Sequence, residues 1–313
     1  MKSKKLSLKK INLKDERYRI SYFFSLEKMI SSLKKMGLIN PPLVAFRDNR
    51  FIIVSGWKRV LACRKLSYSS IQVRVSDAES DLQNFLIALY ENLPTKSFSL
   101  VEKAEIVLRL KKFGMKESRI IEDYFSPLDI PPRSTYLDGF LALSQFEPEL
   151  KEGIHRNNMP FSSIQRLSEY TPKTRSLIFP LLLPLSQNKQ REVLEDIQDI
   201  SERENIPVED VLKKKEIRNI LDLEKLSLLQ KAGKIRLFLR KKRYPLLSSW
   251  EESFKTSLKK MKWPKEIEIR HSPFFEGENI SVTFSFRNRK EFEENLLKLK
   301  GMASNKEFPR LLK

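Results

Sequence analysis

Hydrophobic positions in the first 95 residues switch between a helical and a strand period. Apolar side chains in residues 21–37 recur at helical spacing, and Gly37 is placed to end that helix. Residues 51–56 form a continuous apolar run, whereas residues 71–75 alternate apolar and polar side chains as half-buried strands do. The pattern predicts a small α/β unit built of helix 21–37, strand 38–46, strand 51–56, helix 57–66, strand 71–75 and helix 81–93.

From Ser99 to about Leu185 the hydrophobic period is helical throughout. Ser99 with Glu102 three residues later has the form of a capping box, and Ser134 is predicted to cap a later helix. Two short helices joined by the proline-rich turn "SPLDIPP" suggest a helix-turn-helix. The helices predicted here are 99–114, 115–125, 133–146 and 160–170.

The last third of the chain predicts a charged helical connector followed by an α-β-β-α unit. In that unit the sequence "NISVTFSF" places Ile280, Val282, Phe284 and Phe286 on one face of a strand. A two-stranded sheet is marginal alone, so this face is expected to meet a second copy and form a homodimer. The alternative is that it packs on the connector.

The fold class expected is α+β and mostly helical, with an all-helical middle. The predicted domains are 1–96 (small α/β domain), 97–185 (helix-turn-helix), 186–247 (basic helical connector) and 248–302 (α-β-β-α dimerisation unit).

The excess of basic residues in the chain indicates the kind of partner that it binds. The chain carries 60 Lys and Arg against 40 Asp and Glu, a formal net charge of +20. Residues 231–313 hold 21 of the basic residues and 10 of the acidic ones. A solvated basic surface is the simplest interpretation, but a polyanion partner fits this excess better.

Other functional classes are disfavoured by composition. Cys63 is the only cysteine, so the chain has no internal disulfide and suits a reducing compartment. One cysteine and the two distant histidines make a poor zinc site. The start "MKSKKLSLKK" is no secretory leader, and "SLIFPLLLPL" is too short to span a bilayer. We expect a soluble cytoplasmic protein that does not enter the membrane.

Candidate chemistry begins where the second predicted strand ends. Gly56 separates that strand from a helix whose first residues include Lys58 and Arg59. A glycine lets an anion approach the backbone, the helix start offers free N–H groups, and the two cations add charge. A plain turn with solvated side chains remains the alternative. Further on, Glu91 and Asn92 offer the oxygen ligands that Mg²⁺ prefers, unless they are only the polar end of a helix.

These elements stand in a set order, "GLINPPLV", "IVSGWKRVLACRKL" and "ENLPTKSFSLVEKA". In this order the sequence resembles the ParB family of bacterial partition proteins. The family reads Gly-Leu-Ile-x-Pro-x-x-Val, then Gly-Glu-Arg-Arg-x-x-Ala, then Glu-Asn-Leu-x-Arg. The matching residues are Gly37, Leu38, Ile39, Pro41, Val44, Gly56, Arg59, Ala62, Glu91, Asn92 and Leu93, with Lys58 in place of an arginine. The likeness covers roughly residues 11–302.

The resemblance implies a DNA clamp that takes part in chromosome or plasmid segregation. Family members bind a centromere-like site through the helix-turn-helix, bind CTP with Mg²⁺ in the N-terminal domain, and close as dimers around DNA. It also implies a cytoplasmic, nucleoid-associated location and a ParA-type ATPase as partner. Residues carried over are Gly56, Lys58, Arg59 and Ala62 for the triphosphate, Glu91 and Asn92 for phosphate and metal, and Asn40 near the base or ribose.

Some positions depart from the family pattern. Trp57 stands where the family has an acidic residue implicated in hydrolysis, and an indole cannot take a proton, so at most weak CTPase activity is expected. Pro94 and Thr95 occupy the place of the expected arginine. In the later DNA-reading helix, Ser163 and Gln165 replace a histidine and an arginine. The DNA site is therefore expected to differ from the common one.

DNA contacts are predicted at two places. Arg133, Ser134, Thr135 and Tyr136 begin the recognition helix and would face base edges, and Arg166 would reach phosphate or base. Alternatively, Arg133 and Ser134 only cap a packed helix. The lysines of the first ten residues are expected to form a disordered arm for the partner ATPase, or else a soluble tail.

Two other functions stay open on the sequence. Trp57 and the missing arginine suit a ParB-like DNA-binding regulator without a nucleotide switch. A ParB-like nuclease or phosphotransferase would need a carboxylate or nucleophile near Gly56, and Glu91 is the candidate.

Overall fold

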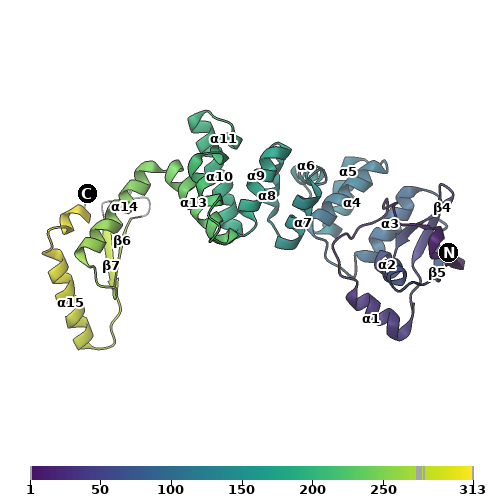
Figure 1. Ribbon diagram of the computed structural model, residues 1–313, viewed down its shortest axis with the longest axis horizontal. Helices are drawn as coiled ribbons and strands as arrows, with labels where there is room; N and C mark the ends of the chain where they lie inside the picture. Colours follow the sequence, from purple (N-terminus) through teal and green to yellow (C-terminus); the bar gives the residue numbers. More distant parts are fainter. Residues whose placement is uncertain (1, 273–276, 278, 312–313) are drawn as a thin grey trace. The chain divides into compact units, whose positions relative to one another are not determined.

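The computed structural model describes residues 2–272, 277 and 279–311, in two compact units that divide between Leu183 and Pro184 (Figure 1). Residues 273–276 and 278, within the predicted dimerisation unit, lie outside the described residues. The fold is mostly helical with a mixed sheet near the N-terminus, which confirms the predicted class. No helix among the described residues is long and apolar enough to cross a bilayer.

The N-terminal sheet has the strand order β1-β5-β3-β4-β2. Strands β1 and β5 pair antiparallel, as do β3 and β4, whereas β2 runs parallel to β4 and β3 parallel to β5. The strands are β1 (Lys2–Ser7), β2 (Ile11–Asn12), β3 (Leu43–Arg47), β4 (Arg50–Ser55) and β5 (Ser70–Val75). Because β1 and β2 belong to opposite edges yet are separated only by the 3₁₀ turn Leu8–Lys10, the sheet must curl strongly.

Strand β1 corrects the prediction of a disordered N-terminal arm. Its residues pair one by one with β5, from Lys2 opposite Val75 to Ser7 opposite Ser70. Leu6 is buried in the core beneath the sheet, while the lysines before it stay exposed. Backbone pairing with a strand more than sixty residues away and one anchoring leucine therefore order this segment despite its charge.

Three helices complete this domain: α1 (Glu27–Met36), α2 (Trp57–Lys65) and α3 (Asp81–Asn92). α3 packs on β4, and α1 packs on α2. Val60 and Cys63 of α2 lie in the same buried cluster as Val44 and Ile53 of the sheet. α1 ends at Gly37 as predicted but begins later than expected, because residues before it form a loop held by side-chain hydrogen bonds.

The rest of the first unit is helical. The capping box of Ser99 and Glu102 is present and begins α4, as predicted. Helix α6 begins at Ser134 itself, so Arg133 rather than Ser134 is the cap, and it makes no side-chain cap hydrogen bond. The helices are α4 (Leu100–Lys112), α5 (Glu117–Arg119) with a π turn (Ile120–Tyr124), a 3₁₀ turn (Ser126–Leu128), α6 (Ser134–Leu143), α7 (Pro148–Asn157), α8 (Phe161–Ser168) and α9 (Pro172–Leu182).

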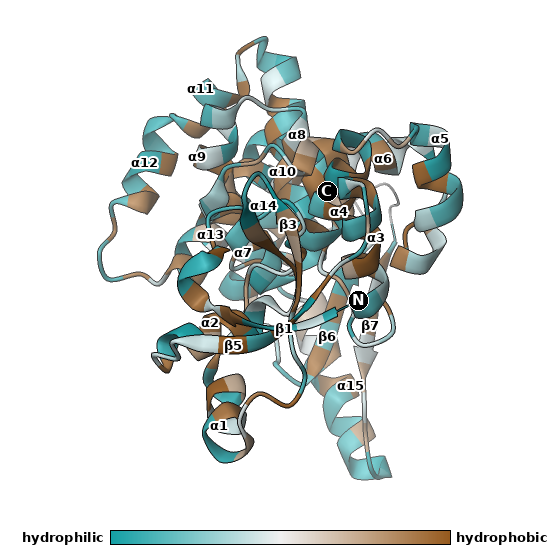
Figure 2. Cartoon of the chain, turned by 90° about the vertical axis from the view of Figure 1, so that its right-hand side faces the viewer, coloured by the Kyte–Doolittle hydropathy of each residue, from teal (hydrophilic) through white to brown (hydrophobic). Residues whose placement is uncertain are grey.

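The second unit is a helical assembly that ends in the predicted α-β-β-α order. Arg243 of α13 pairs with the buried Asp196 of α10 at 3.0 Å and fastens these two helices. The elements are α10 (Gln187–Glu204), α11 (Val208–Leu212), α12 (Lys215–Leu221), α13 (Leu228–Arg243), α14 (Pro245–Met261), β6 (Ile267–His271), β7 (Ile280–Phe284), α15 (Arg289–Ala303) and a 3₁₀ turn (Phe308–Leu311). α15 is mostly hydrophilic in Figure 2, with isolated hydrophobic turns.

Gly139 in the middle of α6 has a packing reason. A Cβ built at this position would lie 2.6 Å from Cζ of Phe161 on α8, closer than real Cβ contacts. The Phe161 ring packs against Phe140 and Tyr136 of α6, with centroids 4.6 and 4.8 Å away. Gly139 therefore allows the close approach of α6 and α8.

We predict that Gly139→Ala destabilises the first unit although alanine is the better helix former. Overpacking costs about 1–3 kcal/mol, which outweighs the gain of about 1 kcal/mol in helix propensity. The matched control is Gly233→Ala in α13, where an added Cβ meets nothing within 4 Å and should stabilise. Urea denaturation of both variants measures the two effects, and a stabilised Gly139→Ala would contradict this packing.

Candidate functional site

The turn between β4 and α2 is built around Gly56. Its φ of 94° lies in the left-handed region, and a Cβ there would approach Pro42 Cβ to 2.8 Å and Arg59 Nε to 2.9 Å. Only glycine fits this turn without strain. No side chain caps α2, so the N–H groups of its first turn remain available to an anion at the positive end of the helix.

The guanidinium of Arg59 lies across this turn. Its Nη1 donates to the backbone carbonyls of Asn40 at 2.9 Å and Pro41 at 3.2 Å. Its Nη2 lies 3.5 Å from Oε1 of Glu91 on α3. Arg59 thus links the loop before β3, the start of α2 and the end of α3.

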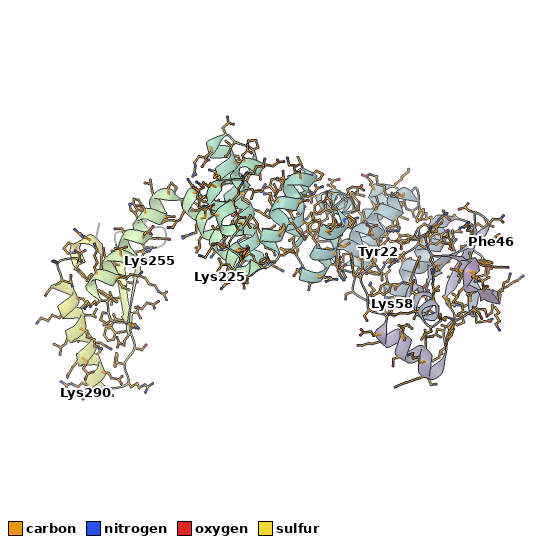
Figure 3. All side chains as sticks on the ribbon, in the orientation of Figure 1. Tyr22, Phe46, Lys58, Lys225, Lys255 and Lys290 are labelled. Carbon is orange, nitrogen blue, oxygen red and sulfur yellow. The ribbon has the colours of Figure 1, made fainter. Side chains whose placement is uncertain are left out.

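A cavity of about 470 Å³ opens beside this turn. Of the residues predicted for nucleotide binding, the structure brings together around it Gly56, Lys58, Arg59, Glu91 and Asn92. Ala62 is fully buried one turn further along α2, and Asn40 lies outside the lining and contributes its carbonyl to Arg59. Figure 3 labels Lys58 on α2 and Tyr22 on the loop that precedes α1.

Trp57 lines the cavity without filling it. Its indole is buried, with the Arg19 guanidinium 5.0 Å from the ring centroid. The buried Nε1–H has no hydrogen-bond partner in the structure. A tryptophan at this position therefore builds the wall of the cavity and provides no carboxylate for acid–base chemistry.

The loop 13–26 forms the opposite wall, and sequence reasoning missed it. Tyr18 hydrogen-bonds Asp81 at the start of α3, and its burial together with this bond raises the pKa of the phenol. Arg109 of α4 donates to the backbone carbonyl of Arg17 at 3.1 Å and to the Tyr22 hydroxyl. The alternation of basic and aromatic residues in "RYRISYFF" was the available indication.

Lys96 is a second functional candidate that the sequence did not reveal. Its ammonium lines the cavity and donates to Ser21 at 2.7 Å and to the buried Glu102 at 2.5 Å. The family pattern expects a cation at position 95, where this chain has Thr95. Lys96 supplies a cation one residue later.

The charges in this cavity favour an anion over a bare metal ion. Lys58, Arg59 and Lys96 outnumber Glu91, the carboxylate in the lining. The Asn92 amide donates to the Ala88 carbonyl at 2.7 Å, which leaves its side-chain oxygen available. No group of three His, Cys, Asp or Glu side chains able to hold a metal exists among the described residues. A Mg²⁺ here would need oxygens from its ligand, as it commonly takes from phosphates.

Cys63 offers no nucleophile to this site. It is fully buried on the inner face of α2, and burial raises the pKa of its thiol. A thiol in this environment stays protonated and inert.

The predicted DNA contacts divide between two helices. Arg133, Ser134 and Thr135 are exposed at the start of α6. The Tyr136 ring stacks on Phe161 with an interplanar angle of 4°, and Arg166 lies on α8, where it pairs with Glu169 at 3.0 Å. The structure therefore brings Arg133, Ser134 and Thr135 together on α6, whereas Arg166 belongs to the neighbouring helix α8.

The two residues of α8 that depart from the family pattern, Ser163 and Gln165, differ in their exposure to solvent. Ser163 is buried, and its hydroxyl oxygen has no hydrogen-bond partner in the structure. Gln165 is partly exposed, and its Nε2 lies 3.4 Å from the Thr135 carbonyl. In this arrangement Ser163 packs inside the unit, and Gln165 connects α8 to the first turn of α6.

Comparison with known proteins places the first part of the chain in a family. Residues 3–93 match the family model of the ParB N-terminal domain. This range contains nearly the whole sheet, the β4–α2 turn and all of α3. The match therefore covers most of the wall of the cavity.

Curated relatives agree with this match. A probable chromosome-partitioning protein ParB of Borreliella burgdorferi is 25% identical over 137 residues, which cover 44% of this chain and 50% of the relative. The chromosome-partitioning protein Spo0J of Thermus thermophilus is 26% identical over 151 residues, covering 48% and 54%. The chain thus spans about half the length of these relatives.

Solved structures with a likeness to this chain include two of the C-terminally truncated ParB of Caulobacter crescentus. One, complexed with CTP-γ-S, has a TM-score of 0.28 at 16% identity and covers 55% of this chain and 94% of that one. The other, complexed with the centromeric parS site, has a TM-score of 0.34 at 14% identity and covers 60% and 96%. The family match and the sequence relatives together show that this chain carries a ParB N-terminal domain and is a relative of the ParB partition proteins.

Proposed function

We propose that this protein is a CTP-binding, DNA-binding partition protein that acts as a dimeric clamp loaded at a centromere-like site. The observation that carries the proposal is the cationic cavity at the β4–α2 turn, most of whose lining belongs to the matched ParB N-terminal domain. A cavity of about 470 Å³ falls within the usual range of ligand pockets, roughly 300–1,000 Å³. The nucleotide is proposed by analogy with the Caulobacter protein described as complexed with CTP-γ-S.

The triphosphate would lie against the start of α2. The backbone N–H groups of its first turn are free there, and the Lys58 and Lys96 ammonium groups also line the cavity. Arg59 is paired with Glu91 across the turn, and a phosphate would compete with that carboxylate for the guanidinium. Asn40 lies beside this guanidinium, and we assign it a place near the base or ribose.

A bound Mg²⁺ would neutralise phosphate charge. Glu91 and the free side-chain oxygen of Asn92 would hold it together with phosphate oxygens, because the site holds a single carboxylate. Glu91 would then exchange Arg59 for the metal as Arg59 turns to the phosphates.

Binding without efficient hydrolysis follows from Trp57. The buried indole stands where the family has its acidic residue, and it can neither accept a proton nor orient a water molecule through a carboxylate. We therefore assign the nucleotide a structural role in closing the clamp. The buried Cys63 and the ion-paired Glu91 give no support to a nuclease or phosphotransferase.

The duplex would contact the first turn of α6. Arg133, Ser134 and Thr135 are exposed there, and the first turn of a recognition helix is the part that reaches base edges. Tyr136 would support this surface through its stack on Phe161.

A second copy would cover the apolar face of the C-terminal unit. Val282 is 41% and Phe286 is 53% exposed, although both are large hydrophobic side chains. The Phe286 ring also packs on Phe292 of α15 with centroids 4.8 Å apart, which extends this face from β7 onto the helix. A homodimer formed here would pair two DNA-binding units. A ParA-type ATPase remains part of the proposal as the motor partner, although β1 holds the N-terminal lysines in the sheet.

We predict that Arg59→Ala weakens Mg²⁺–CTP binding. Removal of a charge-assisted hydrogen bond to phosphate should lower the affinity roughly 10-fold or more. Isothermal titration calorimetry measures the effect, and Arg74→Ala, which removes an exposed arginine of β5 outside the cavity, is the control that should bind normally. Absence of detectable CTP binding by the unchanged protein would leave a static DNA-binding regulator.

We predict that the protein releases phosphate from CTP at no more than the background rate, with or without duplex DNA. The physical reason is that Trp57 replaces the carboxylate. A coupled phosphate-release assay with Mg²⁺ checks this expectation. Release that is faster than background and disappears in Arg59→Ala would show that another group performs the hydrolysis.

We predict that Arg133→Ala weakens binding to the preferred duplex, obtained by selection from random sequences. Removal of a hydrogen bond to a base edge or phosphate costs about 1–3 kcal/mol. Arg156→Ala on α7 removes an equally charged, exposed side chain outside this surface and should bind as the unchanged protein does. Fluorescence anisotropy compares the variants, and equal decreases in affinity would assign the effect to net charge alone.

A further inference from the structure

A second basic hollow lies on the N-terminal domain, apart from the cavity at Gly56. It has a volume of about 700 Å³ and lies where the β1–β2 connection meets the β3–β4 hairpin. It shares no lining residue with the cavity at Gly56. Its charged lining residues are Lys9, Lys10, Lys14, Arg50 and Arg64, with no carboxylate among them.

The cations of this basic hollow are electrostatically unsatisfied. Among the residues that the structure describes, none of the five takes part in an ion pair, and no Asp or Glu lines the hollow. The acidic residues next in sequence, Asp15 and Asp48, are both held by Arg17, at 2.7 and 2.9 Å. Cations gathered in a concave site without counter-charges produce a positive potential that attracts a polyanion.

Two aromatic rings lie among these cations. Phe46 and Phe51 face each other across the β3–β4 hairpin with centroids 5.0 Å apart. Phe46, labelled in Figure 3, is 48% exposed. A large apolar ring left open to water inside a basic surface is suited to stacking on a flat, polar ring system such as a nucleobase.

The remaining lining includes polar groups that suit the same class of ligand, beside the apolar Ile11 and Leu13. Strand β2 ends the sheet, so its outer backbone groups have no strand partner within the described sheet. Asn12 and Asn49 add amide side chains to the hollow. Such groups can hydrogen-bond the edges of unpaired bases.

We propose that this basic hollow is a binding site for single-stranded nucleic acid, with phosphates on the lysines and arginines and a base stacked on Phe46. A free phosphate would gain nothing from the phenylalanine pair, and a flat bilayer would not follow a concave surface into the hollow. A duplex keeps its bases stacked inside the helix, where Phe46 cannot reach their faces. The site is independent of the proposed CTP cavity and of the α6 surface.

The test is fluorescence anisotropy of the full chain with a labelled oligothymidylate of roughly 10 nucleotides, a length typical of single-strand sites. We expect Phe46→Ala to lower the affinity roughly 5- to 100-fold and Phe46→Trp to retain it, because stacking supplies the interaction. We expect the pair Lys10→Gln with Arg50→Gln to flatten the dependence of log affinity on log salt by about 0.7 for each phosphate that is no longer neutralised.

Matched controls make each outcome decisive. Lys34→Gln with Lys35→Gln removes the same charge from an exposed part of α1 and should leave binding nearly unchanged. Arg133→Ala and Arg59→Ala should also bind the oligonucleotide normally, so failure of the proposed clamp would not affect this result. Equal decreases in affinity for both charge pairs, no effect of Phe46→Ala, or binding to anionic phosphatidylserine vesicles without binding to the oligonucleotide would each overturn the proposal.

Discussion

The guanidinium of Arg59 holds separate segments of the N-terminal domain together at one point. It donates to the carbonyls of Asn40 and Pro41 and faces the carboxylate of Glu91, while the left-handed turn at Gly56 leaves it room to cross. The shape of the cavity at this turn depends on the Arg59 guanidinium, because the loop before β3, the start of α2 and the end of α3 all contact it. A carboxylate that pairs with the arginine also makes the site selective, because an incoming anion must outcompete it.

The cavity is joined to the helical part of the first unit by a short polar chain. Lys96 lines the cavity and donates to Glu102, which is only 3% exposed. Glu102 and Ser99 form the capping box of α4, and the Ser99 hydroxyl lies 2.9 Å from Nδ1 of His155 on α7. An anion that drew Lys96 away would leave a buried carboxylate without its cation, which is costly. The start of α4 is thus the place where occupancy of the cavity can reach the helices beyond it.

The basic surface of this protein is organised into distinct sites. At the cavity beside Gly56, Arg59 and Lys96 are matched by Glu91 and Glu102 and are held in place by hydrogen bonds. In the basic hollow around Phe46 the cations have no such partners among the described residues. In the second unit many basic side chains are paired instead, as Arg240 is with Glu251 at 2.8 Å. A net charge of +20 is therefore a poor guide by itself to where an anionic partner binds.

Local patterns along the chain were enough to define most elements and to single out the turn at Gly56, beside which the structure has a cavity. Hydrophobic periods predicted most helices and most strands of the first unit and the α-β-β-α order at the end, because burial of one face is a local pattern. Helices α7 and α9 were not among the predicted ones. The capping box at Ser99 and the glycine turn at Gly56 could also be predicted, since both depend on residues a few positions apart.

The other features of the first unit depend on contacts between segments that are distant in the chain. Strand β1 could not be predicted from its own residues, because it forms only by pairing with β5, more than sixty residues further along the chain. Lys96 and the loop 13–26 reach the cavity only because α4 and α3 hold them there, and Tyr136 turns to Phe161 only because Gly139 lets α6 and α8 approach. The direction in which a side chain points, and the charged residue that pairs with it, depend on segments far apart in the chain. The spacing of hydrophobic residues contains no information about either.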